Sequence, residues 1–162
     1  FSLSIIHSMS IKDNFRLAMR RYIYSVSILS NKDAEDNLNA ITVSSVTSIS
    51  MEPPSLLVCI NKSSRIHNTL KEGSKFCINL LNKDQEELSN ICSDENKYSE
   101  RFNDKNWDIN MIPFLKNAQA NIFCKVDKLT SYHTHTIVVG MVEDSTYSES
   151  ISTLTYVDGK YE

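Results

Sequence analysis

Residues 42–67 constrain the fold of this chain more than any other stretch. A hydroxyl-rich segment, TVSSVTSIS, leads through Pro53-Pro54 into the apolar segment SLLVCI, and a second polar cluster runs from Asn61 to Arg65. Proline cannot donate a hydrogen bond to a central β-ladder, so the proline pair has to lie at a turn between two strands. Hydroxyls, backbone amides and an arginine in two such loops could bind a phosphate. The same residues could also form the ordinary solvent face of a half-exposed strand.

Glycine is scarce, with only Gly73, Gly140 and Gly159 in the chain. Neither the dinucleotide fingerprint G-x-G-x-x-G nor the P-loop pattern G-x-x-x-x-G-K-[ST] can therefore be present. Any nucleotide that the protein binds must be held by another kind of site.

Length and composition predict one soluble domain spanning residues 1–162. Of the 162 residues, 41% are hydrophobic and 23% charged, and the net charge is −3. These values are ordinary for a globular domain with its own core. No basic cluster exceeds Arg20-Arg21, which argues against a nucleic-acid partner. The apolar runs are far too short to cross a membrane.

The cysteines favour a reducing compartment. They form no C-x-x-C pair, and three of the four lie in apolar, strand-like runs: Cys59, Cys77 and Cys124, with Cys92 apart from them. Free buried thiols of this kind are typical of the cytosol, and no signal peptide is recognisable, so we expect a cytoplasmic protein. His133 and His135 lack a matching cysteine pair or carboxylate motif, so no metal site is expected.

Hydrophobic periodicity predicts a mainly β (α+β) domain with a few short helices. Helices are expected over residues 11–21, 64–71 and 84–91. Ser10-x-x-Asp13 and Asp84-x-x-Glu87 resemble capping boxes for the first and last of these. A half-buried strand is expected over 24–28, and further strands over 40–48, 55–61, 76–81, 118–130 and 135–145. Many antiparallel strands with short helices are typical of a small barrel.

Two irregular regions complete this pattern. Asp158-Gly159 lies between short β-prone runs, which predicts a type I′ hairpin in the tail. Residues 93–112 are polar and irregular, with Phe102 and Trp107 as expected anchors. Loops of that length in a compact domain are often functional.

The order and spacing of these segments resemble the flavin reductase-like family, and within it the short-chain NAD(P)H:flavin oxidoreductases that supply two-component monooxygenases. The matching segments are FRLAMRRYIYSVSILS, TVSSVTSIS, MEPPSLLVCI, SSR at 63–65, FCINLL with Gln85, PFLKNAQANIFCKV, HTIVVGMVEDS and LTYVDGKY. They run from Phe15 to Tyr161, nearly the whole chain. The chain departs from the family at Val46, where an aromatic residue is frequent, at Ile66, where threonine is frequent, and at Asn39-Ala40-Ile41, where glycine is common.

The resemblance implies an FMN-binding split β-barrel that forms a homodimer. It implies FMN as the cofactor, with FAD as an alternative, and NADH or NADPH as co-substrate. Hydride would pass from nicotinamide C4 to flavin N5, which requires stacked rings but no general base or nucleophile. Reduced flavin would pass to a partner monooxygenase. Two alternatives stay open: a flavin-dependent reductase of another acceptor, such as ferric iron or cobalamin, and a flavin-binding electron carrier without nicotinamide turnover.

The resemblance assigns flavin binding to both polar clusters. The candidates in the first cluster are Thr42, Val43, Ser44 and Ser45. A regular strand points alternate side chains to opposite faces. Ser44 and Ser45 can therefore serve one ligand only if the strand bends or backbone N–H groups contribute. A solvent-facing hydroxyl is the alternative for each serine.

In the second cluster, main-chain groups would line the flavin ring and side chains would bind the phosphate. The ring candidates are Cys59, Ile60 and Asn61, and the phosphate candidates are Ser63, Ser64 and Arg65. Arginine offers planar, bidentate donors to a dianion, and a helix beginning at Ser64 would point its amide end at an anion. A helix cap beside a solvated arginine is the alternative.

Three further residues are candidates. Asn79 lies inside an apolar strand and needs a partner if it is buried, which could be the flavin or a structural hydrogen bond. The resemblance places His135 beside the flavin, near the nicotinamide, and makes it the catalytic candidate; a core histidine at a strand start is the alternative. Tyr161 lies in a tail that the family uses near the nicotinamide, often across a dimer contact, although an ordinary edge tyrosine would look the same.

Overall fold

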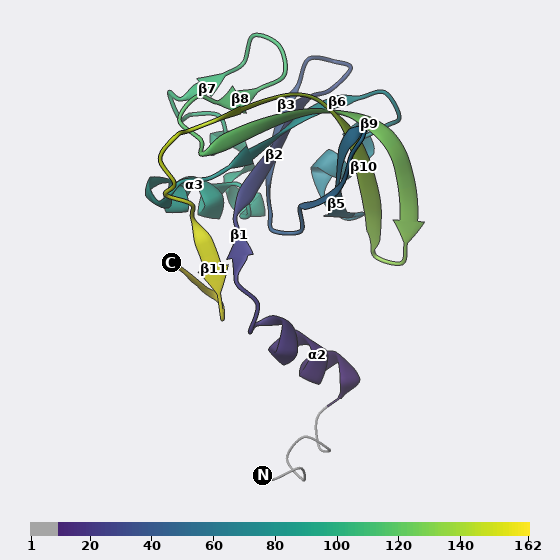
Figure 1. Ribbon diagram of the computed structural model, residues 1–162, viewed down its shortest axis with the longest axis vertical. Helices are drawn as coiled ribbons and strands as arrows, with labels where there is room; N and C mark the ends of the chain where they lie inside the picture. The colour runs from purple at the N-terminus through teal and green to yellow at the C-terminus, as the bar shows by residue number, and fades with distance from the viewer. Residues whose placement is uncertain (1–9) are drawn as a thin grey trace.

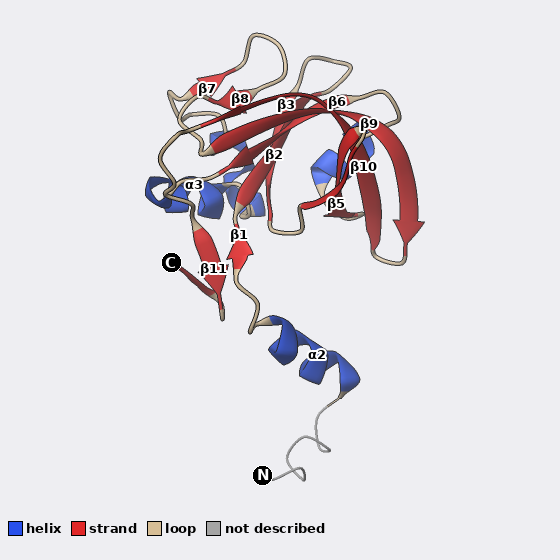
Figure 2. Cartoon of the chain, viewed as in Figure 1, coloured by secondary structure: helices blue, strands red, loops and turns tan. Residues whose placement is uncertain are grey.

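A seven-stranded antiparallel sheet forms the body of the protein (Figure 1). The computed structural model describes residues 10–162. The strand order is β3-β2-β6-β9-β10-β5-β4, with the bounds β2 Ser27–Lys32, β3 Leu38–Val43, β4 Thr47–Met51, β5 Pro54–Asn61, β6 Lys75–Leu80, β9 Ala120–Tyr132 and β10 His135–Tyr147. Strands far outnumber the short helices (Figure 2). The predicted mainly β class is confirmed.

The sheet is open between β3 and β4, although these strands are neighbours in the sequence. Residues 44–46, which we call the seam, belong to neither strand. Within the described residues no ladder joins the two edges. The prediction of one continuous strand over 40–48 is therefore wrong, and the chain bends where Ser44 and Ser45 follow each other. A curved sheet with one open seam is the geometry that a split barrel requires.

The longest hairpin, β9–β10, confirms the two strands predicted over 118–130 and 135–145. Its register shifts between Val139 and Gly140 and again between Val142 and Asp144, and such bulges bend the strands that carry them. A Cβ on Gly140 would lie 2.8 Å from Cζ of Phe76. Glycine therefore allows β10 to pass directly over this buried ring.

Apolar side chains gather in two cores, one on each face of β2. Leu29 packs inside the curved sheet, whereas Val26 and Ile28 pack in the second core outside it. Residues 27–31 are consequently all buried. The strand is interrupted at Val26, between β1 (Tyr24–Ser25) and β2. The prediction of a half-buried strand over 24–28 is wrong because the sheet is covered on both faces here.

The second core lies beneath α3 (Glu86–Ile91) and the irregular segment that follows it. This segment contains η3 (Glu95–Glu100) and the small β7–β8 pair, Trp107–Asp108 with Phe114–Leu115. The ring centroids of Phe102 and Trp107 are 4.6 Å apart, and Trp107 is buried. The two predicted anchors are confirmed.

Side-chain caps start the helices, although not always where expected. The Ser10 hydroxyl accepts a hydrogen bond from the Asp13 amide (3.1 Å) and starts α2 (Ile11–Met19), as predicted. The capping box ahead of α3 joins Asn82 and Gln85 around η2 (Lys83–Gln85), not Asp84 and Glu87. The helix predicted over 64–71 is a five-residue 3-10 helix, η1 (Arg65–Thr69). No described helix is long and apolar enough to cross a membrane.

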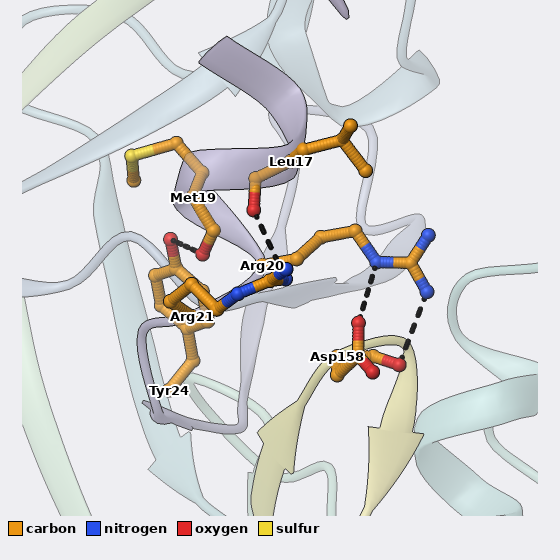
Figure 3. Close-up of polar contacts among 6 residues, drawn as sticks. All are labelled: Leu17, Met19, Arg20, Arg21, Tyr24 and Asp158. Carbon is orange, nitrogen blue, oxygen red and sulfur yellow. Dashed lines mark hydrogen bonds and ion pairs between the residues drawn. The ribbon is translucent and has the colours of Figure 1, made fainter. Parts of the chain in front are cut away.

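The chain's C-terminal hairpin holds the N-terminal helix. Asp158 and Gly159 both have positive φ (50° and 78°) between β11 (Thr155–Val157) and β12 (Lys160–Tyr161), which confirms the predicted turn. Helix α2 extends away from the sheets (Figure 1) and buries no residue. Arg20, just after this helix, donates to the Asp158 carboxylate and carbonyl at 3.1 Å each (Figure 3).

Asn79 occupies the centre of a buried polar network. It is fully buried, and its Nδ2 donates to the Ile28 carbonyl and the Ser30 hydroxyl at 2.9 Å each. Its Oδ1 accepts from the Leu115 amide and from Asn121 Nδ2, also at 2.9 Å. Both amide atoms are thus engaged by protein. These contacts favour the structural alternative for Asn79 over the predicted flavin contact.

Replacing Asn79 with alanine should lower stability without changing ligand affinity. The variant leaves several buried groups unpaired, and each costs about 1–3 kcal/mol, so we expect a loss of at least about 2 kcal/mol in denaturant unfolding. Flavin affinity of the folded variant should equal that of the wild type in a titration. Weaker flavin binding at unchanged stability would instead support the flavin contact.

Candidate functional site

The seam brings β3, β5 and the start of η1 together. The Ser45 hydroxyl accepts a hydrogen bond from the Cys59 amide (3.1 Å) and lies 3.3 Å from the Cys59 carbonyl, to which it donates. Strand β4 pairs with β5 no further along than Leu57. The edge of β5 from Cys59 to Asn61 is therefore uncovered by any described strand, and its backbone faces the seam.

Asn61 shapes the loop that follows β5. Its Oδ1 accepts from the Ser63 amide (2.9 Å) and the Ser63 hydroxyl (2.8 Å). The Ser64 hydroxyl donates to the Asn61 carbonyl (2.7 Å) and makes no cap bond to η1. Local side-chain bonds of this kind fix a tight polar turn. The predicted phosphate loop is thus preorganised. Ser64 occupies the N-cap position of η1, but its side chain makes no hydrogen bond to the helix.

Arg65 extends from this loop toward η3. Its Nε lies 3.5 Å from a carboxylate oxygen of Glu95, and both side chains are largely exposed. Its Cζ lies 4.3 Å from the centroid of the Tyr98 ring, close enough for a cation–π contact. The guanidinium thus makes two contacts with protein at the surface and is largely exposed to solvent.

Contacts with Asn39 and Arg101 hold Tyr98 in place. Its hydroxyl donates to Asn39 Oδ1 (2.5 Å), and the Cζ of Arg101 lies 4.6 Å from its ring centroid. Arg101 is 3% exposed and donates to the carbonyls of Ala40 (2.7 Å) and Asp94 (3.1 Å). Burial raises the pKa of the Tyr98 hydroxyl, which Arg101 and Arg65 oppose.

Sequence reasoning missed Glu95, Tyr98 and Arg101 as neighbours of the site. The only signal was the length of the irregular segment, which marked it as functional but did not single out these residues. The expected anchors, Phe102 and Trp107, pack into the core instead.

His135 lies beside the same loop. It begins β10, its Cα pairs with that of Asn61, and its side chain is exposed. Its Nδ1 lies 2.8 Å from the Thr134 hydroxyl. The exposure contradicts the alternative of a core histidine. The exposed ring can meet a ligand that comes from solvent beside Asn61.

Thr42 and Tyr161 lie on the other side of the seam. The Thr42 hydroxyl donates to the Ser89 carbonyl (2.6 Å), and Tyr161 Oη shares a hydrogen bond of 2.8 Å with the Ser89 hydroxyl. An open pocket of about 340 Å³ separates α3 from the C-terminal hairpin, and Thr42, Ser44 and Tyr161 all line it. The structure therefore brings the tail and the first polar cluster together within one chain.

The side chains of Val43 and Ile60 point away from both the 61–65 loop and the pocket beside Tyr161. Both side chains are buried in the core inside the sheet, so only their main chains could meet a ligand. Asn79 lies deeper still, in the network described above. The structure thus groups Ser45, Cys59, Asn61, Ser63, Ser64, Arg65 and His135 on one side of the seam, and Thr42, Ser44 and Tyr161 on the other.

The cysteines form no disulfide; all four are free thiols, as expected. Burial raises the pKa of Cys92 and of Cys124 to about 12, and that of Cys77 higher still. Thiolates, the reactive form, are therefore scarce at these three positions near neutral pH. Cys59 is only partly buried.

Comparisons with known proteins agree with this geometry. Residues 19–162 match the family described as flavin reductase like domain. The reductase component of the FADH(2)-dependent resorcinol hydroxylase of Rhizobium sp. (strain MTP-10005) is 35% identical over 164 residues, which cover 99% of this chain and 92% of that protein. The FMN reductase (NADH) RutF of Pseudomonas syringae pv. syringae is 30% identical over 149 residues, covering 91% of this chain and 83% of that protein.

A solved structure shares the fold as well. The styrene monooxygenase flavin reductase of Pseudomonas putida S12 matches with a TM-score of 0.78 at 28% identity, covering 92% of this chain and 96% of that one. The family match and the relatives together extend over nearly the whole chain, which confirms the resemblance. This protein belongs to the flavin reductase-like family.

Proposed function

We propose that this chain, as a single domain, is an NAD(P)H-dependent flavin reductase that binds FMN or FAD and hands reduced flavin to a partner monooxygenase. One observation carries the proposal: the preorganised 61–65 loop and Arg65 adjoin an uncovered strand edge and an exposed histidine. The names of the relatives, an FMN reductase (NADH) and the reductase component of a hydroxylase, support the same activity.

The residues divide by the part of the flavin that each would hold. Ser63, Ser64 and Arg65 are proposed for the phosphate: the Arg65 guanidinium would donate to the dianion, and the two serine hydroxyls, which donate to Asn61, hold the loop in shape around it. The β5 edge that begins at Cys59, whose amide and carbonyl are bonded to Ser45, and runs on to Asn61 suits the edge of the ring system. Val43 and Ile60 would support that edge from the core, and Ser45 would hold it in place. Asn79 is not included, because its amide is fully engaged.

His135 and the pocket beside Tyr161 are proposed for the nicotinamide side. A bound flavin accepts hydride from the reduced nicotinamide, so the protein needs to orient the two rings rather than to activate them. His135 can donate or accept one hydrogen bond at the reacting face. Thr42, Ser44 and Tyr161 would hold polar parts of the co-substrate in the 340 Å³ pocket.

Free flavin should be required for turnover. We expect the purified protein to oxidise NADH or NADPH in air at a rate that rises steeply when FMN or FAD is added, because the flavin carries the electrons away. The measurement is the loss of absorbance of reduced nicotinamide, with both nicotinamides crossed with FMN, FAD and riboflavin. Tightly bound flavin that reduces ferric iron or cobalamin without free flavin would favour the acceptor-reductase alternative. Flavin binding with no nicotinamide oxidation would favour an electron carrier.

The variant His135→Ala should slow flavin reduction while leaving flavin binding largely intact. Misplacement of a reacting ring by about 1 Å can cost on the order of a hundredfold, so we expect a clear loss in stopped-flow reduction by NADH. His133→Ala, two residues away in the turn, is the matched control. Normal reduction by the His135 variant would remove this residue from the catalytic set.

The proposal includes a homodimer in the cytoplasm. Helix α2 buries no residue, and the apolar side chains on and after it are strongly exposed, among them Ile11 (91%), Phe15 (64%) and Ile23 (68%). Such an unpartnered apolar surface on an extended arm is typical of a protein–protein contact, and a second copy of the chain is the proposed partner. The four free thiols favour a reducing compartment.

Changing Phe15 to serine should shift the protein toward the monomer. The substitution removes an aromatic ring from the exposed apolar surface of α2, so sedimentation at micromolar concentration should show a smaller species. Lys12→Ser, on the same helix and also exposed, should leave the wild-type dimer unchanged. A wild-type monomer with full flavin reductase activity would contradict the dimer.

A further inference from the structure

We propose that Glu95 determines phosphate affinity by competing with the flavin phosphate for Arg65. This inference rests on the proposed function, because it concerns the same Arg65 site. Its consequence is specific: Glu95 weakens the binding of flavins that carry a phosphate and leaves the binding of riboflavin unchanged.

Arg65 makes two contacts, one with an aromatic ring and one with a carboxylate. The Cζ of Arg65 lies over the Tyr98 ring, 4.3 Å from its centroid, and the Nε of Arg65 lies 3.5 Å from a carboxylate oxygen of Glu95. Arginine binds carboxylates and phosphates through N–H groups on its edge, in the same planar geometry. A phosphate that binds on the Nε side of this edge has to displace Glu95, while the contact with Tyr98 can persist.

The platform under Arg65 is rigid. Tyr98 is tied to β3 through Asn39, and the buried guanidinium of Arg101 adjoins the same ring. Arg101 is in turn fixed by two backbone carbonyls, one in β3 and one just before η3. Arg65 therefore does not need to move far when it exchanges a carboxylate for a phosphate.

The charges around the platform favour an anion. Two guanidiniums, Arg65 and Arg101, lie against one ring, and Glu95 is the only carboxylate that pairs with either of them among the ion pairs of residues 10–162. In the absence of ligand, Glu95 supplies the negative charge. A flavin phosphate brings up to two negative charges and displaces it.

The competition is modest in size, which suits a flavin that has to leave. Glu95 and Arg65 have side chains that are 60% and 61% exposed, and exposed pairs of this kind are weak and screened by salt. A weak competitor lowers affinity without abolishing it. Glu95 would thus speed the exchange of phosphorylated flavins and favour their transfer to a partner.

The test is a titration of FMN and riboflavin against four proteins: wild type, Glu95→Gln, Arg65→Ala and the double variant. Glu95→Gln should tighten FMN about two- to fivefold, as expected for an exposed pair, and should not change riboflavin. In the Arg65→Ala background the same substitution should have no effect on FMN. The gain should shrink in high salt.

Glu100→Gln is the matched control, because Glu100 is an exposed carboxylate of the same 3-10 helix and forms no ion pair among the described residues. An equal gain in FMN affinity from this control would overturn the inference, since general electrostatics would then explain the result. Unchanged FMN affinity in Glu95→Gln, or a gain that persists without Arg65, would overturn it too. These outcomes leave the flavin reductase proposal intact, whereas a wild-type protein that binds neither flavin would refute that proposal itself.

Discussion

The two hydrogen bonds between the Ser45 hydroxyl and the backbone of Cys59 hold the site together. Strands β3 and β4 lie at opposite edges of one sheet, yet only the seam separates them in the sequence. The chain must therefore leave one edge and join the other within a few residues, and a ladder cannot span that gap. One hydroxyl takes the place of a strand partner and leaves the rest of the β5 edge open.

Strand β3 organises the surroundings of that opening. On one side, Asn39 and Ala40 anchor the Tyr98 and Arg101 pair on which Arg65 rests. On the other, Thr42 is bonded to the end of α3, beside the pocket that Tyr161 lines. A single short strand thus positions the proposed phosphate contact and the proposed co-substrate pocket. Rigid elements of this kind suit a catalyst that works by orientation rather than by acid–base groups.

Much of the fold could be predicted from sequence because its signals are local. The Ser10 cap, the Asp158-Gly159 turn and the long β9–β10 strands follow from short patterns. The burial of β2 on both faces could not, because it depends on α3 and the 93–112 segment folding over the sheet. In the site, the resemblance assigned Arg65 to the phosphate and His135 to the nicotinamide side, and the structure has both beside the 61–65 loop. It could not separate Asn79 from the ligand-facing residues, nor reveal Glu95 and Tyr98, because those contacts join distant parts of the chain.

The bond between Arg20 and Asp158 links residues that are 138 positions apart in the sequence. During synthesis, α2 leaves the ribosome early, but its anchor exists only after residue 158 has been translated. Domains generally fold as units, so the helix acquires its anchor only when nearly all of the chain is present. The exposed apolar side chains of α2, Ile11 and Phe15 among them, are thus positioned only when the C-terminal hairpin is present.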